Sequence, residues 1–394
     1  MVESLAEFRA FLPINIMFGC GQLKNLHTAA LPGKKALIVI TNGKSVKENG
    51  YLDALIHELT LAGVGYSVFD KITANPTDES VMRGAAQARA DGCDFVVGLG
   101  GGSPIDASKG IAIMVTNEGT LWDYMPSGTG KGVKTKNSPL PIVAITTTAG
   151  TGSEADPAFV ATNEATNEKI GMYHPDIYPR IAIVDPELMV SVPPRYTAFQ
   201  GFDALFHCTE GYISNKAHFF SDMLAITGIE HIGASLAAAV KDGKNMKARE
   251  SVAFAASISG MQIIMGSLTS AHSLEHAMSA YHPNLPHGAG LIIISVAYYS
   301  KFKDVPESKE RLVKMAKALG KADAKSGDDF ITALKGILAD CGVAGLKMSD
   351  YGIVRDELPV FVQNAKAAMG SKFFNDPRML SDEEILSIYE QSYQ

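Results

Sequence analysis

The pattern of hydrophobic and polar positions changes near residue 190. Before that point, short β-branched runs alternate with segments whose apolar residues recur at helical spacing, which is typical of a parallel sheet with crossover helices. Helices are expected at residues 47–62 and 78–91. Strands are expected at residues 36–40, 65–69, 95–99, 142–146 and 181–184.

After Pro193-Pro194 no strand pattern remains, and the apolar spacing is helical. The helical stretches are 197–240, 248–279, 290–302, 308–319, 327–341 and 381–393. The sequence therefore predicts an α/β N-terminal domain with a parallel sheet over residues 1–192, and an all-helical C-terminal domain over residues 193–394. Enzymes that bind a nucleotide in one part of the chain commonly have this plan, so we expect the N-terminal domain to be the nucleotide-binding one.

One stretch of the helical half raises the question of a membrane. Residues 251–274 contain no Asp, Glu, Lys or Arg, and this length exceeds the roughly 20 residues that span a bilayer. Their Ser, Thr, Gln and His side chains are costly in hydrocarbon. We expect a helix buried among other helices, and no membrane partner.

Composition narrows the classes of partner and compartment. The 394 residues carry a net charge of −7 and contain no long Lys/Arg run, which argues against nucleic acid. The four cysteines show no CxxC pairing and are too sparse for a disulfide framework. Acidic residues near the N-terminus are unlike a secretory signal. These features favour a cytoplasmic protein that acts on a small molecule.

A glycine run follows the third expected strand. In Gly98-Leu99-Gly100-Gly101-Gly102-Ser103, a buried strand leads into glycines and then into a helix. Backbone amides exposed by glycine, together with a helix N-terminus, suit phosphate. The spacing is not the G-x-G-x-x-G fingerprint. A tight turn without ligand is the alternative.

A second polar segment follows the fourth strand, Thr146-Thr147-Thr148-Ala149-Gly150-Thr151-Gly152-Ser153-Glu154. Hydroxyls at the carboxyl end of a strand suit a ligand that lies across the top of the sheet. The segment is equally consistent with a loop that caps the next helix.

The helical half contains a candidate metal site. Asp203 and His207 are four residues apart, as are His272 and His276, so each pair shares a helix face. Four of the ten histidines lie within residues 272–287. One carboxylate and three imidazoles suit Fe(II), Zn(II), Ni(II) or Co(II). The alternative is a set of core histidines, which would bury polar groups at a cost of a few kcal/mol each unless they are bonded.

These residues are similar to a known family, the iron-containing (group III) alcohol dehydrogenases, which include lactaldehyde reductase, propanediol dehydrogenase and butanol dehydrogenase. The resemblance spans nearly the whole chain. It is carried by Phe18-Gly19-Cys20-Gly21, Ala74-Asn75-Pro76-Thr77, Gly100-Gly101-Gly102-Ser103-Pro104-Ile105-Asp106, Thr147-Thr148-Ala149-Gly150-Thr151-Gly152-Ser153-Glu154, Asp185-Pro186, Gly201-Phe202-Asp203-Ala204, the histidine cluster and Asn375-Asp376-Pro377-Arg378.

The resemblance implies roles for individual residues. It implies that the metal ligands are Asp203, His207, His272 and His287, and that His276 lies near the nicotinamide as a candidate proton carrier. The interval before His287 is slightly longer than the usual family spacing, so His282 is an alternative ligand. The implied or candidate dinucleotide contacts are Asn42, Asn75, Gly101, Gly102, Ser103, Asp106, Thr147, Thr148, Thr151 and Lys169.

The end of the first strand bears on the choice between NAD and NADP. Sites selective for NAD place an acid against the ribose 2′-hydroxyl. Residues 40–45 contain no acid, Asn42 is neutral and Lys44 could pair with a phosphate. The sequence therefore leans slightly to NADP(H) and leaves NAD(H) open.

The favoured function is reversible reduction of a small aldehyde to its primary alcohol with NAD(P)(H) and a divalent metal, Fe(II) or alternatively Zn(II). A lyase similar to dehydroquinate synthase is the alternative, although the motifs contain few basic residues for a polyanionic substrate. A metallohydrolase without nucleotide would leave the glycine run unexplained. The resemblance also implies a homodimer or a larger homo-oligomer.

Overall fold

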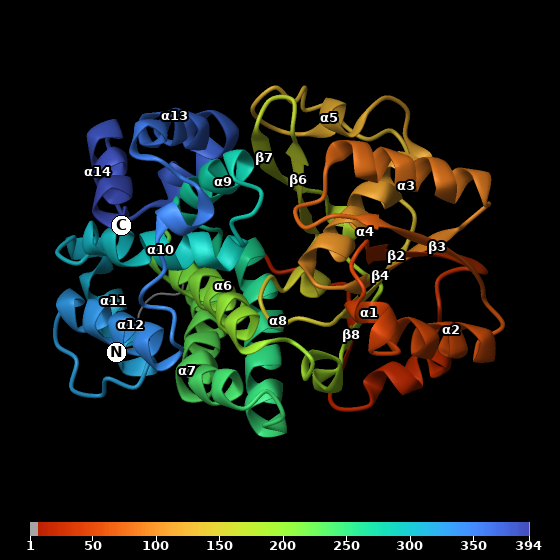
Figure 1. Ribbon diagram of the computed structural model, residues 1–394, viewed down its shortest axis with the longest axis horizontal. Coiled ribbons are helices and arrows are strands. Elements are labelled where there is room, and N and C mark those ends of the chain that lie inside the picture. The colour runs from red at the N-terminus through yellow and green to blue at the C-terminus, as the bar shows by residue number, and fades with distance from the viewer. Residues whose placement is uncertain (1–6, 394) are drawn as a thin grey trace. The chain divides into compact units, whose positions relative to one another are not determined.

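The computed structural model describes residues 7–393, and its internal contacts divide the chain into two units (Figure 1). One unit is Leu12–Ser191. The other begins at Val192, and residues 7–11 also belong to it. This division lies one residue from the boundary that Pro193-Pro194 led us to expect.

The unit Leu12–Ser191 is built on a six-stranded sheet in the order β1-β8-β5-β4-β2-β3, with every neighbouring pair parallel. The chain runs from β2 outward to β3, then returns past β2 to β4, β5 and β8. The strand order thus reverses between β2 and β4, the place where sheets of this kind bind ligands at their carboxyl ends. The strands are β1 (Asn15–Phe18), β2 (Lys35–Thr41), β3 (Gly65–Ile72), β4 (Phe95–Gly100), β5 (Ile142–Thr146) and β8 (Ile181–Val184).

Helices cover both faces of this sheet. On one face, Ile38 of β2 and Val97 of β4 share a core with Leu55 of α2 (Tyr51–Leu61). On the other, α4 (Gly102–Thr116) lies so close that a Cβ on Gly98 would be 2.8 Å from Ser108 Oγ. Strands buried on both faces form continuous apolar runs. For this reason they could be recognised in the sequence, and all five expected strands are present.

The remaining elements of this unit are short or polar. The expected helix at 47–62 is interrupted at Gly50, whose φ of 74° breaks it into α1 and α2. Three strands were missed because they are short or carry many polar residues: β1 and the antiparallel pair β6 and β7. The bounds are α1 (Ser45–Glu48), α3 (Asp78–Ala90), α5 (Leu121–Tyr124), β6 (Ala158–Asn163) and β7 (Glu168–Tyr173).

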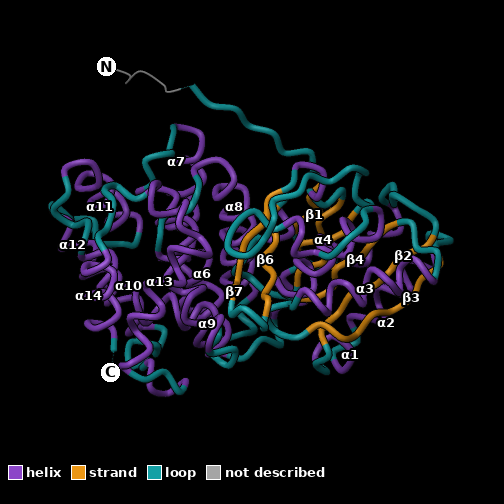
Figure 2. The backbone as a smooth tube through the Cα atoms, turned by 90° about the horizontal axis from the view of Figure 1, so that it is seen from above, coloured by secondary structure: helices purple, strands orange, loops and turns teal. Residues whose placement is uncertain are grey.

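The second unit is helical, and no strand occurs in its described residues (Figure 2). Its central helix is α6, which is buried along most of its length and packs against α7, α8 and α10. The helices are α6 (Pro194–Ile213), α7 (Phe219–Lys241), α8 (Met246–Gly266), α9 (Ala271–Tyr281), α10 (His287–Ser300), α11 (Pro306–Ala318), α12 (Gly327–Asp340), α13 (Leu358–Met369) and α14 (Asp382–Ser392).

Two expected helices are each broken in the structure. The stretch 197–240 divides into α6 and α7, and the stretch 248–279 divides into α8 and α9, whose axes differ by 111°. The second break follows Gly266 and includes Ser267, which has a positive φ of 61°. The expectation of one buried helix over residues 251–274 was therefore wrong, because a polar corner at residues 267–270 turns the chain. Helix α13 was also missed.

Among residues 7–393, one helix is long and apolar enough to cross a membrane by length and composition, namely α7, with 33% of its most apolar window buried. Helices α8 and α9 pass the same test only when they are taken together as one span bent by 111°. Core helices of globular proteins pass the same test, and α7 packs against α6 and α8. Among the described residues, none of the four cysteines forms a disulfide bond.

Candidate metal centre

Three helices of the second unit bring the predicted metal ligands together. Helix α6 carries Asp203 and His207 one turn apart, and α9 carries His272 in its first turn. Pro286 precedes α10, so His287 is the first residue of that helix. Asp203, His207 and His272 are buried, and His287 is partly exposed.

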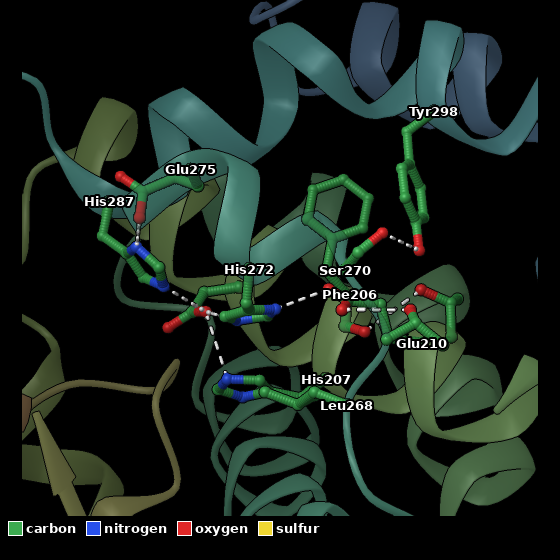
Figure 3. Close-up of polar contacts among 12 residues, drawn as sticks. Phe206, His207, Glu210, Leu268, Ser270, His272, Glu275, His287 and Tyr298 are labelled. Atoms are coloured by element: carbon green, nitrogen blue, oxygen red, sulfur yellow. Dashed lines mark hydrogen bonds and ion pairs between the residues drawn. The ribbon is translucent and has the colours of Figure 1, made fainter. Parts of the chain in front are cut away.

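The ligand atoms converge on one point. Oδ1 of Asp203 lies 3.5 Å from Nε2 of His207, 3.5 Å from Nε2 of His272 and 3.4 Å from Nε2 of His287. In Figure 3, the rings of these three histidines lie around one place. Four ligands held at about 2.1 Å around a tetrahedral metal are separated from one another by about 3.4 Å. The separation of Asp203 Oδ1 from each imidazole nitrogen therefore matches one edge of a tetrahedral coordination shell, and the ligand atoms of Asp203, His207 and His272 all lie within 4.8 Å of one another.

Two of these atoms have no protein partner that satisfies them. Within residues 7–393, Asp203 Oδ1 and His272 Nε2 are buried and make no hydrogen bond. Burying such groups without a partner is costly. A divalent cation between them would satisfy both, and one carboxylate with three imidazoles is a donor set suited to first-row metals. The residues fit a metal.

The electrostatics of the cluster also favour a cation. Burial opposes ionisation of Asp203, but the charges of His207 and His287 outweigh it and hold the pKa of Asp203 well below its ordinary value. Burial likewise opposes a charge on His272, yet Glu210 and Asp203 raise the pKa of His272 to about 10. The buried carboxylates thus create a strongly negative environment that attracts positive charge.

Two buried glutamates complete the cluster and were missed from the sequence. Oε1 of Glu210 lies 2.5 Å from Nδ1 of His272, and Glu275 contacts Nδ1 of His287. Both glutamates are fully buried. Their positions contained a signal, because Glu210 lies three residues after His207 and Glu275 three residues after His272, each on the helix face of a ligand.

The structure separates the remaining histidines of this region. The ring centre of His276 lies 5.4 Å from that of His287 and 6.4 Å from that of His272, so His276 borders the cluster. His282 lies elsewhere, with its Nε2 3.0 Å from Glu357. Of the two alternatives left open by the sequence, the structure brings His287 to the ligand cluster.

Residues near the C-terminus bond to the turn between α8 and α9. Nδ2 of Asn375 donates to Ser267 Oγ at 3.0 Å and to the Leu268 carbonyl at 2.9 Å. Nζ of Lys372 lies 3.4 Å from the same Ser267 hydroxyl. The motif Asn375-Asp376-Pro377-Arg378 therefore positions the helix that carries two site histidines.

In the other unit, the two predicted nucleotide loops lie against each other. Gly100 and Thr146 are paired at the carboxyl ends of β4 and β5, and the Thr147 amide donates to the Gly100 carbonyl at 2.8 Å. A Cβ on Gly101 would be 3.0 Å from Thr148 Cγ2, and one on Gly102 would be 2.6 Å from Thr151 Cγ2. Glycine is thus required for this packing at the N-terminus of α4, where Ser103 is partly exposed.

Two further predicted nucleotide contacts, Asp106 and Lys169, are buried or bonded within the protein. Both carboxylate oxygens of Asp106 accept hydrogen bonds from the protein, from Ser153 Oγ at 2.5 Å and from the Val160 amide at 2.9 Å. Asp106 therefore joins α4 to the Thr-rich loop and to β6. Lys169 is buried on β7, close enough to affect the pKa of Asp106, which burial raises.

Asn42 and Asn75 follow β2 and β3, at the same edge of the sheet as the glycine run. The Asn42 amide donates to the Ile72 carbonyl at 2.8 Å, and Asn75 has a left-handed backbone with φ 56°. Both asparagines therefore lie on the side of the sheet where a ligand is expected.

Both halves of the chain match models of the same protein family. Residues 13–186 match the family model described as iron-containing alcohol dehydrogenase, and residues 197–393 match the C-terminal model of the Fe-containing alcohol dehydrogenase family. The chain is 34% identical over 372 residues to 1,3-propanediol dehydrogenase of Klebsiella pneumoniae, with 92% of each chain covered. It is 30% identical over 386 residues to NAD-dependent methanol dehydrogenase of Bacillus methanolicus, covering 96% of this chain and 98% of that one.

Solved structures show the same fold. An archaeal halo-thermophilic alcohol dehydrogenase from a Red Sea brine pool is 32% identical and superimposes with a TM-score of 0.94, over 99% of this chain and 100% of that one. Both family models, the relatives and the shared architecture point the same way. The chain belongs to the family of iron-containing alcohol dehydrogenases and is an oxidoreductase of that type.

Proposed function

We propose that the protein interconverts a small aldehyde and its primary alcohol by hydride transfer to or from a nicotinamide cofactor, with a divalent metal bound by Asp203, His207, His272 and His287. The observation that carries the proposal is the convergence of these four side chains in a member of a family of iron-containing alcohol dehydrogenases. Membership of this family favours a redox reaction over the lyase alternative.

The chain's own residues have distinct tasks in this proposal. Asp203 and the three imidazoles would hold iron, or zinc in its place, which when bound supplies a Lewis acid to polarise the carbonyl oxygen. Glu210 and Glu275 fix the imidazole orientations. His276 borders the cluster, and its imidazole would exchange a proton with the alcohol oxygen, since histidine titrates near neutral pH.

The nucleotide part of the proposal rests on the first unit. The N-terminus of α4 and the amides of Gly101, Gly102 and Ser103 would bind the pyrophosphate, with Thr148 and Thr151 beside them. The relative from Bacillus methanolicus is named as NAD-dependent, and a 28% identical sulfoacetaldehyde reductase from Bifidobacterium kashiwanohense was solved with NAD+. These relatives support NAD(H), whereas the absence of an acid at residues 40–45 favoured NADP(H).

The test uses the full chain, loaded anaerobically with Fe(II) or Zn(II), and a panel of short aldehydes with NADH or NADPH. Loss of nicotinamide absorbance that requires both aldehyde and metal is expected. Metal-loaded protein that oxidises neither cofactor with any aldehyde would disprove the proposed reaction. Sedimentation of the same sample tests the further proposal of a homodimer or a larger homo-oligomer.

A further inference from the structure

The two buried glutamates behind the ligand histidines have a task of their own. We propose that Glu210 and Glu275 are positioning residues that set the metal affinity of the site, each by accepting a hydrogen bond from the Nδ1–H of one ligand imidazole. The inference rests on the metal-dependent function proposed above, but it concerns binding of the ion and can be measured without turnover.

Both carboxylate oxygens of Glu210 are bonded, one to His272 and the other to Thr269. Oε1 of Glu210 lies 2.5 Å from His272 Nδ1, and Oε2 accepts a hydrogen bond from Thr269 Oγ1 at 3.2 Å (Figure 3). Glu210 is 0% exposed and His272 is 3% exposed. Because Glu210 belongs to α6 and His272 to α9, the pair also sets the distance between two ligand helices.

The pair Glu275 and His287 repeats this arrangement on the next helix. Glu275 of α9 contacts Nδ1 of His287, the first residue of α10, and Figure 3 shows the carboxylate facing that ring. A Cβ on Gly290 would lie 2.8 Å from Glu275 Cγ, so the glycine leaves room for the carboxylate. Two of the three ligand imidazoles therefore have a buried carboxylate at Nδ1.

The hydrogen bonds determine which nitrogen can bind a cation. A neutral imidazole carries one N–H, and a carboxylate at Nδ1 places it there, which leaves the Nε2 lone pair free. The Nε2 atoms of His272 and His287 are the ones that point at Asp203 Oδ1. The carboxylates also make the imidazoles stronger donors, as such outer partners do in metal sites generally.

Charge gives a second reason. Burying an anion is costly unless a positive charge compensates it, and with Asp203 the cluster holds three carboxylates. A divalent ion with these three anions leaves a net charge of about −1, compared with +1 if both glutamates were neutral. The glutamates therefore make binding of the cation more favourable.

The chain contains a matched control for this proposal. Glu58 is 4% exposed, and its Oε2 lies 2.6 Å from Nδ1 of His27, in the unit Leu12–Ser191. The substitution Glu58→Gln thus removes a buried carboxylate from a histidine that is outside the metal cluster. Glu210→Gln and Glu275→Gln each remove a buried carboxylate from a ligand histidine. The glutamine keeps an oxygen that can accept a hydrogen bond from Nδ1–H.

The experiment measures the dissociation constant of Zn(II) by competition with a chelator, for the parent and for each variant, together with the melting temperature of the metal-free proteins. Glu210→Gln and Glu275→Gln are each expected to weaken Zn(II) binding by about 10- to 100-fold. Glu58→Gln is expected to leave it within about twofold. The Co(II) derivatives should show altered d–d spectra in the first two variants alone.

A double-mutant cycle separates positioning from general damage to the fold. His287→Ala retains three of the four candidate ligands, and its weakened Zn(II) binding is measured by direct titration at high Zn(II) concentration. If Glu275 acts through His287, then Glu275→Gln should have little further effect on Zn(II) binding in this background. Equal effects in both backgrounds, or Zn(II) affinities of both glutamine variants within twofold of the parent, would overturn the inference. A parent that binds Zn(II) tightly but reduces no aldehyde would refute the proposed function and leave this result standing.

Discussion

The carboxylate of Asp376 accepts two hydrogen bonds from Ser270, one from its backbone amide at 2.8 Å and one from its hydroxyl at 2.7 Å. Tyr298 donates a third at 3.0 Å. Ser270 is the N-cap position of α9 and its own side chain makes no cap hydrogen bond. A residue more than a hundred positions further along the chain thus caps the helix that carries His272 and His276.

This contact predicts an unusual pH dependence of stability. Burial raises the pKa of Asp376 to about 7, above the ordinary value of 3.8. A carboxyl whose pKa is raised in the folded state stabilises the fold fully below its unfolded pKa, and that contribution is lost as the pH rises from about 4 through 7. Asp376→Asn keeps the shape and should remove this loss, which amounts to at most about 4 kcal/mol.

The measurement is urea unfolding of metal-free protein from pH 4 to pH 8. Relative to the parent, Asp376→Asn should become more stable toward pH 8, and the two curves should converge near pH 4. Parallel curves for parent and variant would show that Asp376 does not titrate in this range. Asp323→Asn, an exposed carboxylate, is the control and should leave the slope unchanged.

Lys109 is a buried cation on which the first unit depends. Its ammonium is 0% exposed and donates to Asp156 Oδ1 at 2.9 Å, and also to Ser153 and Ala158. Lys109→Met would leave Asp156 buried without its cation, which typically costs about 3–5 kcal/mol. Adding Asp156→Asn should recover part of that loss. Denaturant unfolding measures both, and Lys303→Met, which breaks a surface pair with Asp328, should have little effect.

Gly102 tests the nucleotide site. In Gly102→Ala the new methyl would lie 2.6 Å from Thr151 Cγ2, so the Thr151 side chain or its loop must shift. We expect NAD(H) to bind at least about tenfold more weakly, a loss of about 1.4 kcal/mol. Gly336→Ala is the control, because its Cβ would meet nothing within 4 Å, and alanine should stabilise α12 slightly. Nicotinamide fluorescence titration would show unchanged affinity for both variants if the loops do not bind the cofactor.

Substitutions of Asp203 and His272 test the proposed metal ligands directly. Asp203→Ala removes the oxygen that lies within 3.5 Å of three imidazoles, and His272→Ala removes one of those imidazoles. Both should abolish bound metal and turnover together. Metal analysis of anaerobically purified protein, alongside an aldehyde assay, measures the two effects. A variant that lacks metal and retains turnover would refute the metal's role.

His276 is expected to behave differently from the ligands. Because its ring lies beside the cluster and the four ligand atoms come from other residues, His276→Gln should keep the metal. Loss of a proton carrier typically slows a reaction by about 10²–10⁴-fold. Metal analysis and kcat measure the two effects. His231→Gln, which alters a histidine bonded to Ser251, is the control and should retain the rate.

The sequence predicted the sheet well because strands covered on both faces are continuous apolar runs. Residues 142–146 and 181–184 were placed without error. The sequence did not predict the turns that divide the two long helical stretches. Nothing in the apolar pattern of residues 248–279 indicated a turn, because the break depends on contacts from Asn375 and Asp376, far along the chain. Long-range hydrogen bonds leave no periodic trace in a single segment.

The candidate site was predictable to the extent that its residues are rare types at helical spacing. Asp203 with His207, and His272 with His276, show that spacing. Glu210 and Glu275 were missed because glutamate is common on helix surfaces, and only the fold shows that these two are fully buried. Asp106 remains a predicted cofactor contact, and the fold adds that both its carboxylate oxygens also accept hydrogen bonds from the protein.

The three helices that carry the candidate ligands begin at residues 194, 271 and 287, and α10 packs against both α6 and α9. An ion bound by these side chains would cross-link the three helices. It would stabilise the folded state by about 2.7 kcal/mol when its free concentration is 100 times the dissociation constant. Chelation should then shorten the protein's lifetime against proteolysis as well as stop its chemistry. The supply of metal to the cell would thereby set how much of this enzyme persists.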